Sequence, residues 1–464
     1  MSQIQEAYPT PPNTIVRVGT PRLNKYQRLI ARLYEAMILL WIEQPIQGPQ
    51  VTVSHNNVSL IASRRRLTTG LAHFCDWDKG GRTTTSIGIE DSEEAFIFWV
   101  ASNQGFEQDE SVSAPRTPTF LRHSLQRLQD VTRRPDPSAA WLAHQADELA
   151  RSFALFAASR IRKEASLLSR MATLCIGYLN GSATRRGNCR NDPQMDTLRR
   201  LSQEVLADED GESQAKVSGN ARHFVGRLAE HIRVSKNLVE DALRVREILD
   251  IFRVSEIHAP SCVQPPEIDS HTTLDSILGR MISKEDDEFS KVQEDLSRFK
   301  NHVGLEGQII EQMLKLQSKP PIVHSEVQVL NHFHGRRLRF ADDDRFVGTS
   351  KFSCFCCKLY YRHHPSRPVE PDSHEQIYLN WGPINLPEGS HDVSYLELRN
   401  TLNPVIFGVR DAFFRAMRSK RISAFNHPNS ITGLTRSAYT LAYTDSDSEA
   451  DSEQEGGTAL NDFW

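Results

Sequence analysis

The chain has 464 residues, of which 39% are hydrophobic and 25% are charged, and its formal net charge is −4. This composition is ordinary for a folded protein, and it excludes a disulfide-stapled miniprotein, collagen and a coiled-coil rod. At roughly 100–200 residues per domain, the length predicts about two to four domains with sizeable cores.

The sequence carries no signal for a membrane or secretory protein. The best apolar run, residues 36–42, is far shorter than the roughly 18 residues that a membrane helix needs. The N-terminal residues MSQIQEAYPTPPN lack the basic start and apolar stretch of a secretory signal. We therefore expect no membrane partner and an intracellular location, cytoplasmic or nuclear, in a reducing compartment.

In chain order, residues 1–25 are rich in Pro, Thr and Asn and are predicted to be a disordered tail, after which apolar residues follow a helical spacing from Tyr26. Residues 51–62 and 94–100 are rich in β-branched and aromatic side chains between turn formers, which favours two short strands. Residues 106–138 contain four prolines and many charges, so we expect mostly loop there.

Helical patterns dominate the middle of the chain. Apolar residues recur every three or four positions in residues 138–179 and 214–252, which predicts long amphipathic helices. Residues 26–258 are therefore interpreted as a mainly helical region of unknown function. Three prolines then interrupt the pattern within residues 259–272, which we interpret as a linker between domains.

The remaining chain divides into a domain and a tail. Helices are predicted at residues 273–299 and 305–316, before two consecutive prolines. Residues 273–425 are interpreted as a second domain with these helices at its start. Residues 426–464 form a predicted disordered tail, since six acidic residues and no basic residue lie within residues 444–455. Nothing in this charge distribution predicts bulk electrostatic binding to nucleic acid.

The cysteines suggest metal chemistry. Seven cysteines are an odd number, and three of them crowd into residues 354–357, which does not suit a disulfide framework. Cys354 and Cys357 are three residues apart, so at the first turn of a helix their sulfurs lie on one face and can bind one tetrahedral zinc. His324 would supply a third ligand. Three protein ligands leave the fourth position for water, which is the pattern of a catalytic zinc site.

Glu326 follows His324 by two residues and is not needed as a ligand. Its carboxylate could take a proton from the zinc-bound water and deliver it to a leaving group. H-x-E followed by C-x-x-C is the signature of zinc deaminases, in which zinc-bound hydroxide attacks cytosine or adenine and ammonia leaves.

Beyond these motifs, the blocks GTSKFSCFCCKLYY and SHEQIYLNWGPI resemble a deaminase-like family, found mainly in fungi, of the cytidine deaminase superfamily. The resemblance covers residues 300–425. It implies an α/β/α zinc domain in which H-x-E begins one helix and C-x-x-C begins the next. The whole chain is then an α+β multidomain protein. The matching elements are helices at residues 323–333 and 354–361 and strands at residues 345–350 and 376–380.

The sequence departs from the superfamily in two places. Ser353 stands where a proline usually precedes the first cysteine. The fold also usually begins with a strand hairpin before the histidine, but only KPPIV separates a predicted helix from His324. The hairpin is therefore missing, rearranged or supplied from upstream.

The preferred interpretation is a zinc-dependent hydrolytic deaminase acting on a nucleobase, nucleoside or nucleotide, free or within nucleic acid. Zinc-bound hydroxide would be the nucleophile and Glu326 the proton shuttle. His374 and Trp381 could line a base pocket, because aromatic faces stack on bases and a ring nitrogen can read a base edge, although core packing is equally compatible. The helical region would serve substrate selection, regulation or protein partners.

The alternative is a non-catalytic interaction protein with a structural zinc site or a degenerate deaminase domain. A closed structural site would need a fourth protein ligand, which would exclude the reactive water. The candidates for that fourth ligand are Cys356, His332, His334, His363 and His364.

Overall fold

A computed structural model describes residues 23–43, 59–106, 117–185, 211–265, 268, 271–281 and 304–418. Its strands are β1 (Thr85–Asp91), β2 (Phe96–Ser102), β3 (Phe252–Glu256) and β4 (Gly348–Thr349). Its helices are α1 (Lys25–Glu43), α2 (Leu60–Cys75), α3 (Thr117–Arg133), α4 (Ala139–Phe156), α5 (Ala158–Arg185), α7 (Gly211–Arg244), α8 (Glu247–Asp250), α9 (Leu274–Met281), α11 (Leu305–Ser318), α12 (Ser325–Arg336), α13 (Phe355–His363) and α14 (Tyr395–Arg418). Many helices with one small sheet confirm a mixed α+β fold.

The sheet has the order β3-β2-β1-β4 and brings distant parts of the chain together. β1 and β2 form an antiparallel hairpin, β3 lies parallel to β2, and β4 pairs antiparallel with β1 through Ile87 and Gly348. Of these four strands, only β4 lies between α12 and α13 in the sequence. The hairpin beside α12 is therefore formed by β1 and β2, which belong to residues 26–258, the region interpreted as mainly helical.

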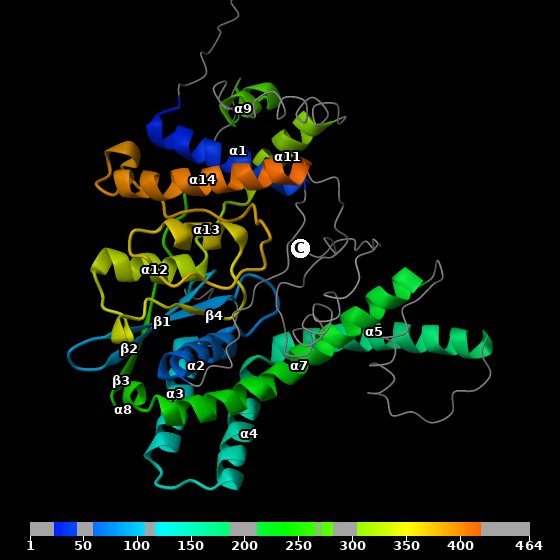
Figure 1. The fold of residues 1–464 in the computed structure, drawn as a ribbon, viewed down its shortest axis with the longest axis vertical. Helices are drawn as coiled ribbons and strands as arrows, with labels where there is room; N and C mark the ends of the chain where they lie inside the picture. The colour runs from blue at the N-terminus through cyan, green and yellow to red at the C-terminus, as the bar shows by residue number, and fades with distance from the viewer. Residues whose placement is uncertain are drawn as a thin grey trace, which may run out of the picture.

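Helices cover both faces of this sheet (Figure 1). α12 packs on β1 and β2 on one face, and α2 packs on β1 and β4 on the other. Gly88 of β1 permits the close approach of α12, because a Cβ at this position would lie 2.8 Å from side-chain atoms of Val329 and Phe333. α13 lies beside α12, and α1 and α14 pack together beyond it.

Two apolar cores follow from these layers. One is formed mainly by α1, α12, α13 and α14, and the other by α2, α3, α4, α7 and the opposite face of the sheet. Successive strand residues point to opposite faces. Ile87 and Ile89 accordingly enter the second core, while Gly88 faces α12.

A buried group of charges joins α5 and α7 to the segment before α13. The Glu164 carboxylate lies 2.8 Å from an Arg227 nitrogen and 3.2 Å from Arg160 Nε, and its side chain has no exposed surface. Arg160 also contacts the Asp76 carboxylate, which lies 3.1 Å from the Lys351 ammonium. Lys351 is three residues before Cys354, so the helical region and the cysteine motif are tied through these charges.

Three sequence predictions are wrong, and two of these errors concern segments rich in turn formers. Residues 106–138 were predicted to be mostly loop, but α3 occupies Thr117–Arg133. Pro118 stands in the first turn, where a missing N–H is tolerated, and Pro135 and Pro137 follow the end of the helix. The strand predicted at 51–62 is contradicted from Leu60, where α2 begins, and residues 51–58 lie outside the described residues.

The strand predicted at residues 376–380 is also wrong. These residues form no strand, and the chain makes only a single bridge there, between Trp381 and Ile322. The bridge holds residue 381 beside the segment that leads into His324. The apolar pattern of residues 376–380 therefore reflects burial and not strand pairing.

The other predicted elements are confirmed with shifted ends. β2 matches the strand predicted at 94–100, and α4 with α5 covers residues 138–179 with a break at Ala157. α11, α12, α13 and β4 match their predictions, while the pattern at 214–252 divides into α7, α8 and the first residue of β3. Only α9 is described within 273–299. The predicted tail 426–464 and residues 1–22 lie outside the described residues.

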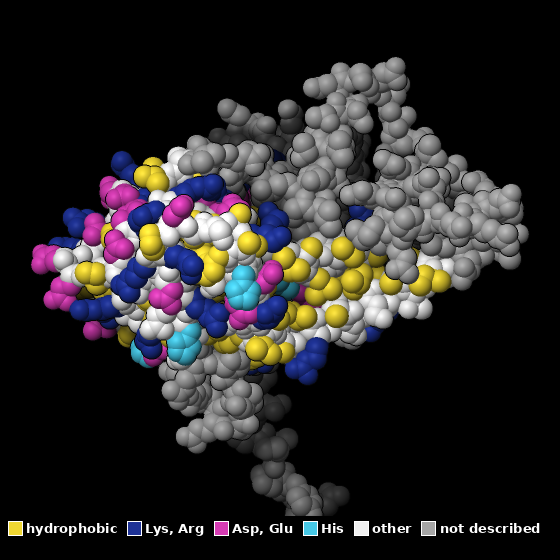
Figure 2. Space-filling model, turned by 90° about the horizontal axis from the view of Figure 1, so that it is seen from below, with side chains coloured by type: hydrophobic (Ala, Val, Ile, Leu, Met, Phe, Trp, Pro, Cys, Tyr) yellow, Lys and Arg dark blue, Asp and Glu magenta, His cyan; other side chains and the backbone are white. Residues whose placement is uncertain are grey.

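Helices α5 and α7 extend away from the body of the fold as a pair (Figure 1). Hydrophobic side chains cover much of the face of this arm that Figure 2 shows. Leu174 and Ile176 of α5 and Ile232 of α7 are 44%, 56% and 52% exposed. Among the described residues, no helix combines the length and the apolar character needed to cross a membrane.

Candidate metal centre

Three predicted ligands meet at the adjoining N-terminal ends of two helices. His324 is the N-cap of α12, Cys354 is the N-cap of α13, and Cys357 lies in the first turn of α13. The His324 Nδ1 atom is 3.7 Å from Cys354 Sγ and 3.4 Å from Cys357 Sγ. All three ligand atoms lie within 4.8 Å of one another, and all three residues are buried.

These distances suit a tetrahedral zinc ion. With Zn–N of about 2.0 Å and Zn–S of about 2.3 Å, tetrahedral geometry separates the nitrogen from each sulfur by about 3.5 Å. The two measured N···S separations fall on either side of that value. One imidazole and two thiol groups are also ligand types that zinc prefers. The residues present therefore fit a zinc ion.

The two thiols of the centre differ in their pKa values. Although burial raises the pKa of the Cys354 thiol, its hydrogen bond with Cys357 and the neighbouring His324 outweigh burial and lower that pKa to about 6. Burial lowers the pKa of His324, but the charge of Cys354 raises it further, so the net shift is upward. Burial and the negative charge of Cys354 hold the pKa of Cys357 well above its usual value. A cation between the sulfurs would stabilise both thiolates.

Residues of the upstream hairpin hold the start of α12. The backbone N–H of Ser325 donates a 2.7 Å hydrogen bond to Oδ1 of Asn103, the residue that directly follows β2. The hydroxyl groups of Ser325 and Ser86 are 2.8 Å apart. Sequence reasoning missed both Asn103 and Ser86, because they precede their partners by 222 and 239 residues and no local pattern relates them.

Glu326 lies beside the three ligands without joining them. It is 4% exposed, and its backbone oxygen accepts a 2.8 Å hydrogen bond from the Tyr361 hydroxyl on α13. The charge of its carboxylate acts on both the Cys357 thiol and the His324 ring. The carboxylate therefore lies near the three candidate ligands.

His374 is also buried near the centre. Its ring packs against Tyr378, whose own ring centroid is 6.4 Å from that of His324. Its Nδ1 atom accepts a 3.1 Å hydrogen bond from the Gln376 backbone. Burial and the adjacent His324 lower the pKa of His374 to about 3, so its ring is neutral at pH 7.

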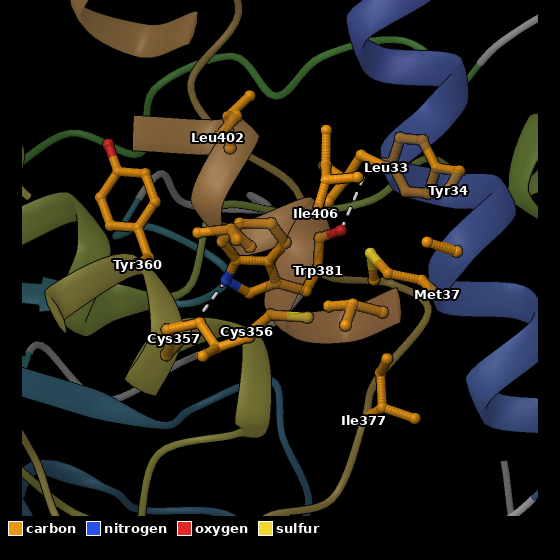
Figure 3. Close-up of a cluster of buried hydrophobic side chains, with 14 of the residues drawn as sticks. Leu33, Tyr34, Met37, Cys356, Cys357, Tyr360, Ile377, Trp381, Leu402 and Ile406 are labelled. Carbon is orange, nitrogen blue, oxygen red and sulfur yellow. Dashed lines mark hydrogen bonds between the residues drawn. The ribbon is translucent and has the colours of Figure 1, made fainter. Parts of the chain in front are cut away.

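Trp381 lies behind the cysteines, within the apolar core (Figure 3). Its side chain has no exposed surface, and its indole Nε1 donates a hydrogen bond to Cys357 Sγ at 3.1 Å. In this conformation neither face of the indole is open for stacking on a base.

The side chains considered as a fourth ligand lie elsewhere. His332 packs on Trp99 at 4.3 Å, His334 contacts Glu397, and the His364 ring contacts Ser366. His363 ends α13, and Cys356 points into the apolar core. Within the described part of the chain, the group of side chains that could hold a metal ion consists of His324, Cys354 and Cys357.

Comparisons with known proteins agree with this local arrangement. Residues 323–385 match the model of the OTT_1508-like deaminase family, and the matched segment contains both the H-x-E and the C-x-x-C motif. No curated protein and no solved structure matches the chain. The match supports a deaminase-type domain of the cytidine deaminase-like class in this part of the chain.

Proposed function

We propose that this protein is a zinc-dependent hydrolytic deaminase that removes an exocyclic amine from a nucleobase, nucleoside or nucleotide, free or within nucleic acid. The observation that carries the proposal is the convergence of His324, Cys354 and Cys357 beside the Glu326 carboxylate, within a segment that matches a deaminase family. Three ligands leave one coordination position open.

Each residue then has a defined task. Zinc would be held by His324, Cys354 and Cys357 and would supply a water molecule activated near neutral pH. Glu326 would take a proton from that water and pass it to the departing amine, which leaves as ammonia. The buried position of Glu326, at 4% exposure, keeps competing water away from the transferred proton.

For substrate contact, we propose His374 rather than Trp381 as the neighbouring aromatic group. The neutral His374 ring and Tyr378 lie on the His324 side of the centre. An imidazole nitrogen can donate to or accept from the edge of a base, and a tyrosine ring can stack on it.

The test is the Glu326→Gln variant, assayed by ammonia release and mass spectrometry over a panel of nucleosides, nucleotides and single-stranded oligonucleotides. We expect the parent to deaminate a member of the panel and the variant to lose that activity while retaining zinc. Glu306→Gln, an exposed acid in the first turn of α11, is the matched control and should retain activity. Equal activity in Glu326→Gln and the parent would refute the proposed proton transfer.

A second candidate function is an interaction protein whose zinc serves only to hold the fold together. The exposed apolar side chains of α5 and α7 favour this alternative, since such patches mark protein interaction sites. It requires four protein ligands on zinc. An oxygen ligand detected by X-ray absorption on the purified zinc protein would argue against it, whereas a complete nitrogen and sulfur shell would argue against the deaminase.

We further propose an intracellular location. Among the described cysteines, Cys75, Cys262, Cys354, Cys356 and Cys357 are free thiols, as expected in a reducing compartment. Microscopy of a fluorescent fusion checks this, and a signal confined to the secretory pathway would contradict it.

A further inference from the structure

Trp381 contacts the metal-ligating group through a polar atom. Its indole Nε1 is 3.1 Å from Cys357 Sγ and donates a hydrogen bond to that sulfur, and the side chain is completely buried. Figure 3 shows the ring between α13, α14 and α1, with its nitrogen directed at Cys357. A buried indole N–H requires a partner, and here the partner is a predicted ligand atom.

The surrounding chain fixes the direction of this N–H group. The Trp381 carbonyl accepts a 3.3 Å hydrogen bond from the buried Tyr34 hydroxyl of α1, and the Trp381 backbone N–H donates to the Tyr378 carbonyl at 3.1 Å. The bridge to Ile322 places residue 381 next to the segment that enters α12. Leu33, Met37, Leu402 and Ile406 pack around the ring. The indole therefore cannot turn away from the sulfur without repacking this core.

Each predicted sulfur ligand receives one N–H group. The backbone N–H of Cys357 donates to Cys354 Sγ at 3.4 Å, as a helix N-cap geometry provides. Cys357 lies inside the helix, and among the described residues no backbone N–H donates to its sulfur. The indole of Trp381 supplies the N–H for this second sulfur from outside the helix.

We propose that Trp381 is a positioning residue for the metal centre, whose indole N–H orients the Cys357 thiolate and reduces its electron donation to the bound metal. This inference rests on the metal site of the proposed function. A hydrogen bond to a ligating sulfur withdraws charge from it, and such outer contacts tune metal affinity and Lewis acidity. Trp381 thereby holds the ligand in place and helps to activate whatever the metal binds.

The first test compares Trp381→Phe with the parent after loading with Co²⁺. Phenylalanine retains an aromatic ring and removes the N–H group. We expect the sulfur-to-cobalt charge-transfer band to move to longer wavelength, because the thiolate becomes more electron-rich, and metal affinity measured by chelator competition to fall by about tenfold. A purely structural role would change thermal stability and leave the band in place.

Trp99→Phe is the matched control. The Trp99 indole also donates a hydrogen bond from a partly buried position, 2.6 Å to Glu90 Oε2, but its partner is not a predicted ligand. We expect neither the band nor the affinity to change in this variant. A folded Trp381→Phe protein that binds Co²⁺ with an unshifted band would overturn the inference.

A measurement on the unaltered chain covers the case in which Trp381→Phe does not fold. In the ¹¹³Cd-loaded, ¹⁵N-labelled parent, an indole proton donating to a cadmium-bound sulfur should show scalar coupling to ¹¹³Cd. Cadmium bound without coupling to any indole proton would refute the role of Trp381 and leave the metal site intact. A folded parent that binds none of these metals would refute the metal site and this inference together.

Discussion

The side-chain oxygen of Asn103 accepts a 2.7 Å hydrogen bond from the backbone N–H of Ser325. Ser325 is the first residue of α12, and His324 is its N-cap, but the His324 side chain makes no capping hydrogen bond. Asn103 therefore performs the capping from another part of the chain. It also donates a 2.8 Å hydrogen bond to the Gly81 carbonyl, which locks its orientation.

We expect Asn103→Ala to weaken both the fold and the metal site. The substitution removes a buried acceptor from the start of α12, so the free energy of unfolding should fall by about 1–3 kcal/mol. Zinc should also be lost at a lower chelator concentration, because the backbone at His324 is no longer fixed. Urea unfolding and chelator titration measure the two effects. Ser138→Ala, which removes the exposed N-cap of α4, should lower stability only, and a fall in its zinc retention would weaken this explanation.

Gly88→Ala should displace α12, the helix that begins after His324. The added Cβ would lie 2.8 Å from side-chain atoms of both Val329 and Phe333, so α12 must move or repack. We expect a loss of about 1–3 kcal/mol in the free energy of unfolding together with reduced zinc content. The control is Gly335→Ala in α12 itself. A Cβ at Gly335 would meet nothing within 4 Å, so this substitution should leave stability unchanged or raise it slightly. Equal stability of the two variants would show that α12 does not pack on Gly88 as described.

Glu164→Gln should destabilise the fold strongly. Glu164 holds Arg160, Arg227 and His231 in the buried charge group, with no exposure of its own side chain. Removing one partner of buried ion pairs leaves uncompensated charge, so we expect a loss of about 3–5 kcal/mol in urea unfolding. Glu148→Gln removes a surface carboxylate paired with Arg151 and should cost about 0–1 kcal/mol. Comparable losses in the two variants would contradict a special role for burial.

His364 should make the protein less stable in acid. Burial and the neighbouring His334 lower its pKa to about 3, while Tyr360 packs on its ring and Ser366 hydrogen-bonds to Nδ1. An unfolded histidine has a pKa of about 6.5, so the unfolded state binds more protons between these values and stability falls as pH is lowered through this window. At pH 5 the contribution of this one group is a loss of about 2 kcal/mol relative to pH 7.

The measurement is urea unfolding at pH 7 and pH 5 for the parent and His364→Asn, which keeps an acceptor near Nδ1. We expect the variant to lose less stability than the parent on acidification. His144→Asn, an exposed position on α4, should behave like the parent. An unchanged pH dependence in His364→Asn would assign the acid sensitivity to other groups.

The sequence predicted those parts of the site that depend on local spacing. His324 and Glu326 are two residues apart, and Cys354 and Cys357 are one helical turn apart, so motif and helix geometry were sufficient to identify them. Most helices likewise followed from apolar periodicity. α3 was not predicted because four prolines suggested a loop, although Pro135 and Pro137 follow the helix and Pro118 occupies its first turn, where proline is tolerated.

The parts that could not be predicted depend on contacts between distant segments. The contact of Asn103 with Ser325 crosses 222 residues, and nothing in either local sequence specifies the other. The aromatic character of Trp381 suggested substrate stacking, but its position is decided by the core that α1 and α14 build around it. Its hydrogen bond to Cys357 could be found only from the folded arrangement.

The central claim is that His324, Cys354 and Cys357 hold one zinc ion, and the most direct test is zinc content per chain in the purified parent and His324→Ala. His334→Ala, on the same helix but paired with Glu397, is the control. We predict about one zinc per chain in the parent and the control and loss of zinc in a folded His324→Ala protein. Unchanged zinc in His324→Ala, or no zinc in a folded parent, would contradict the account.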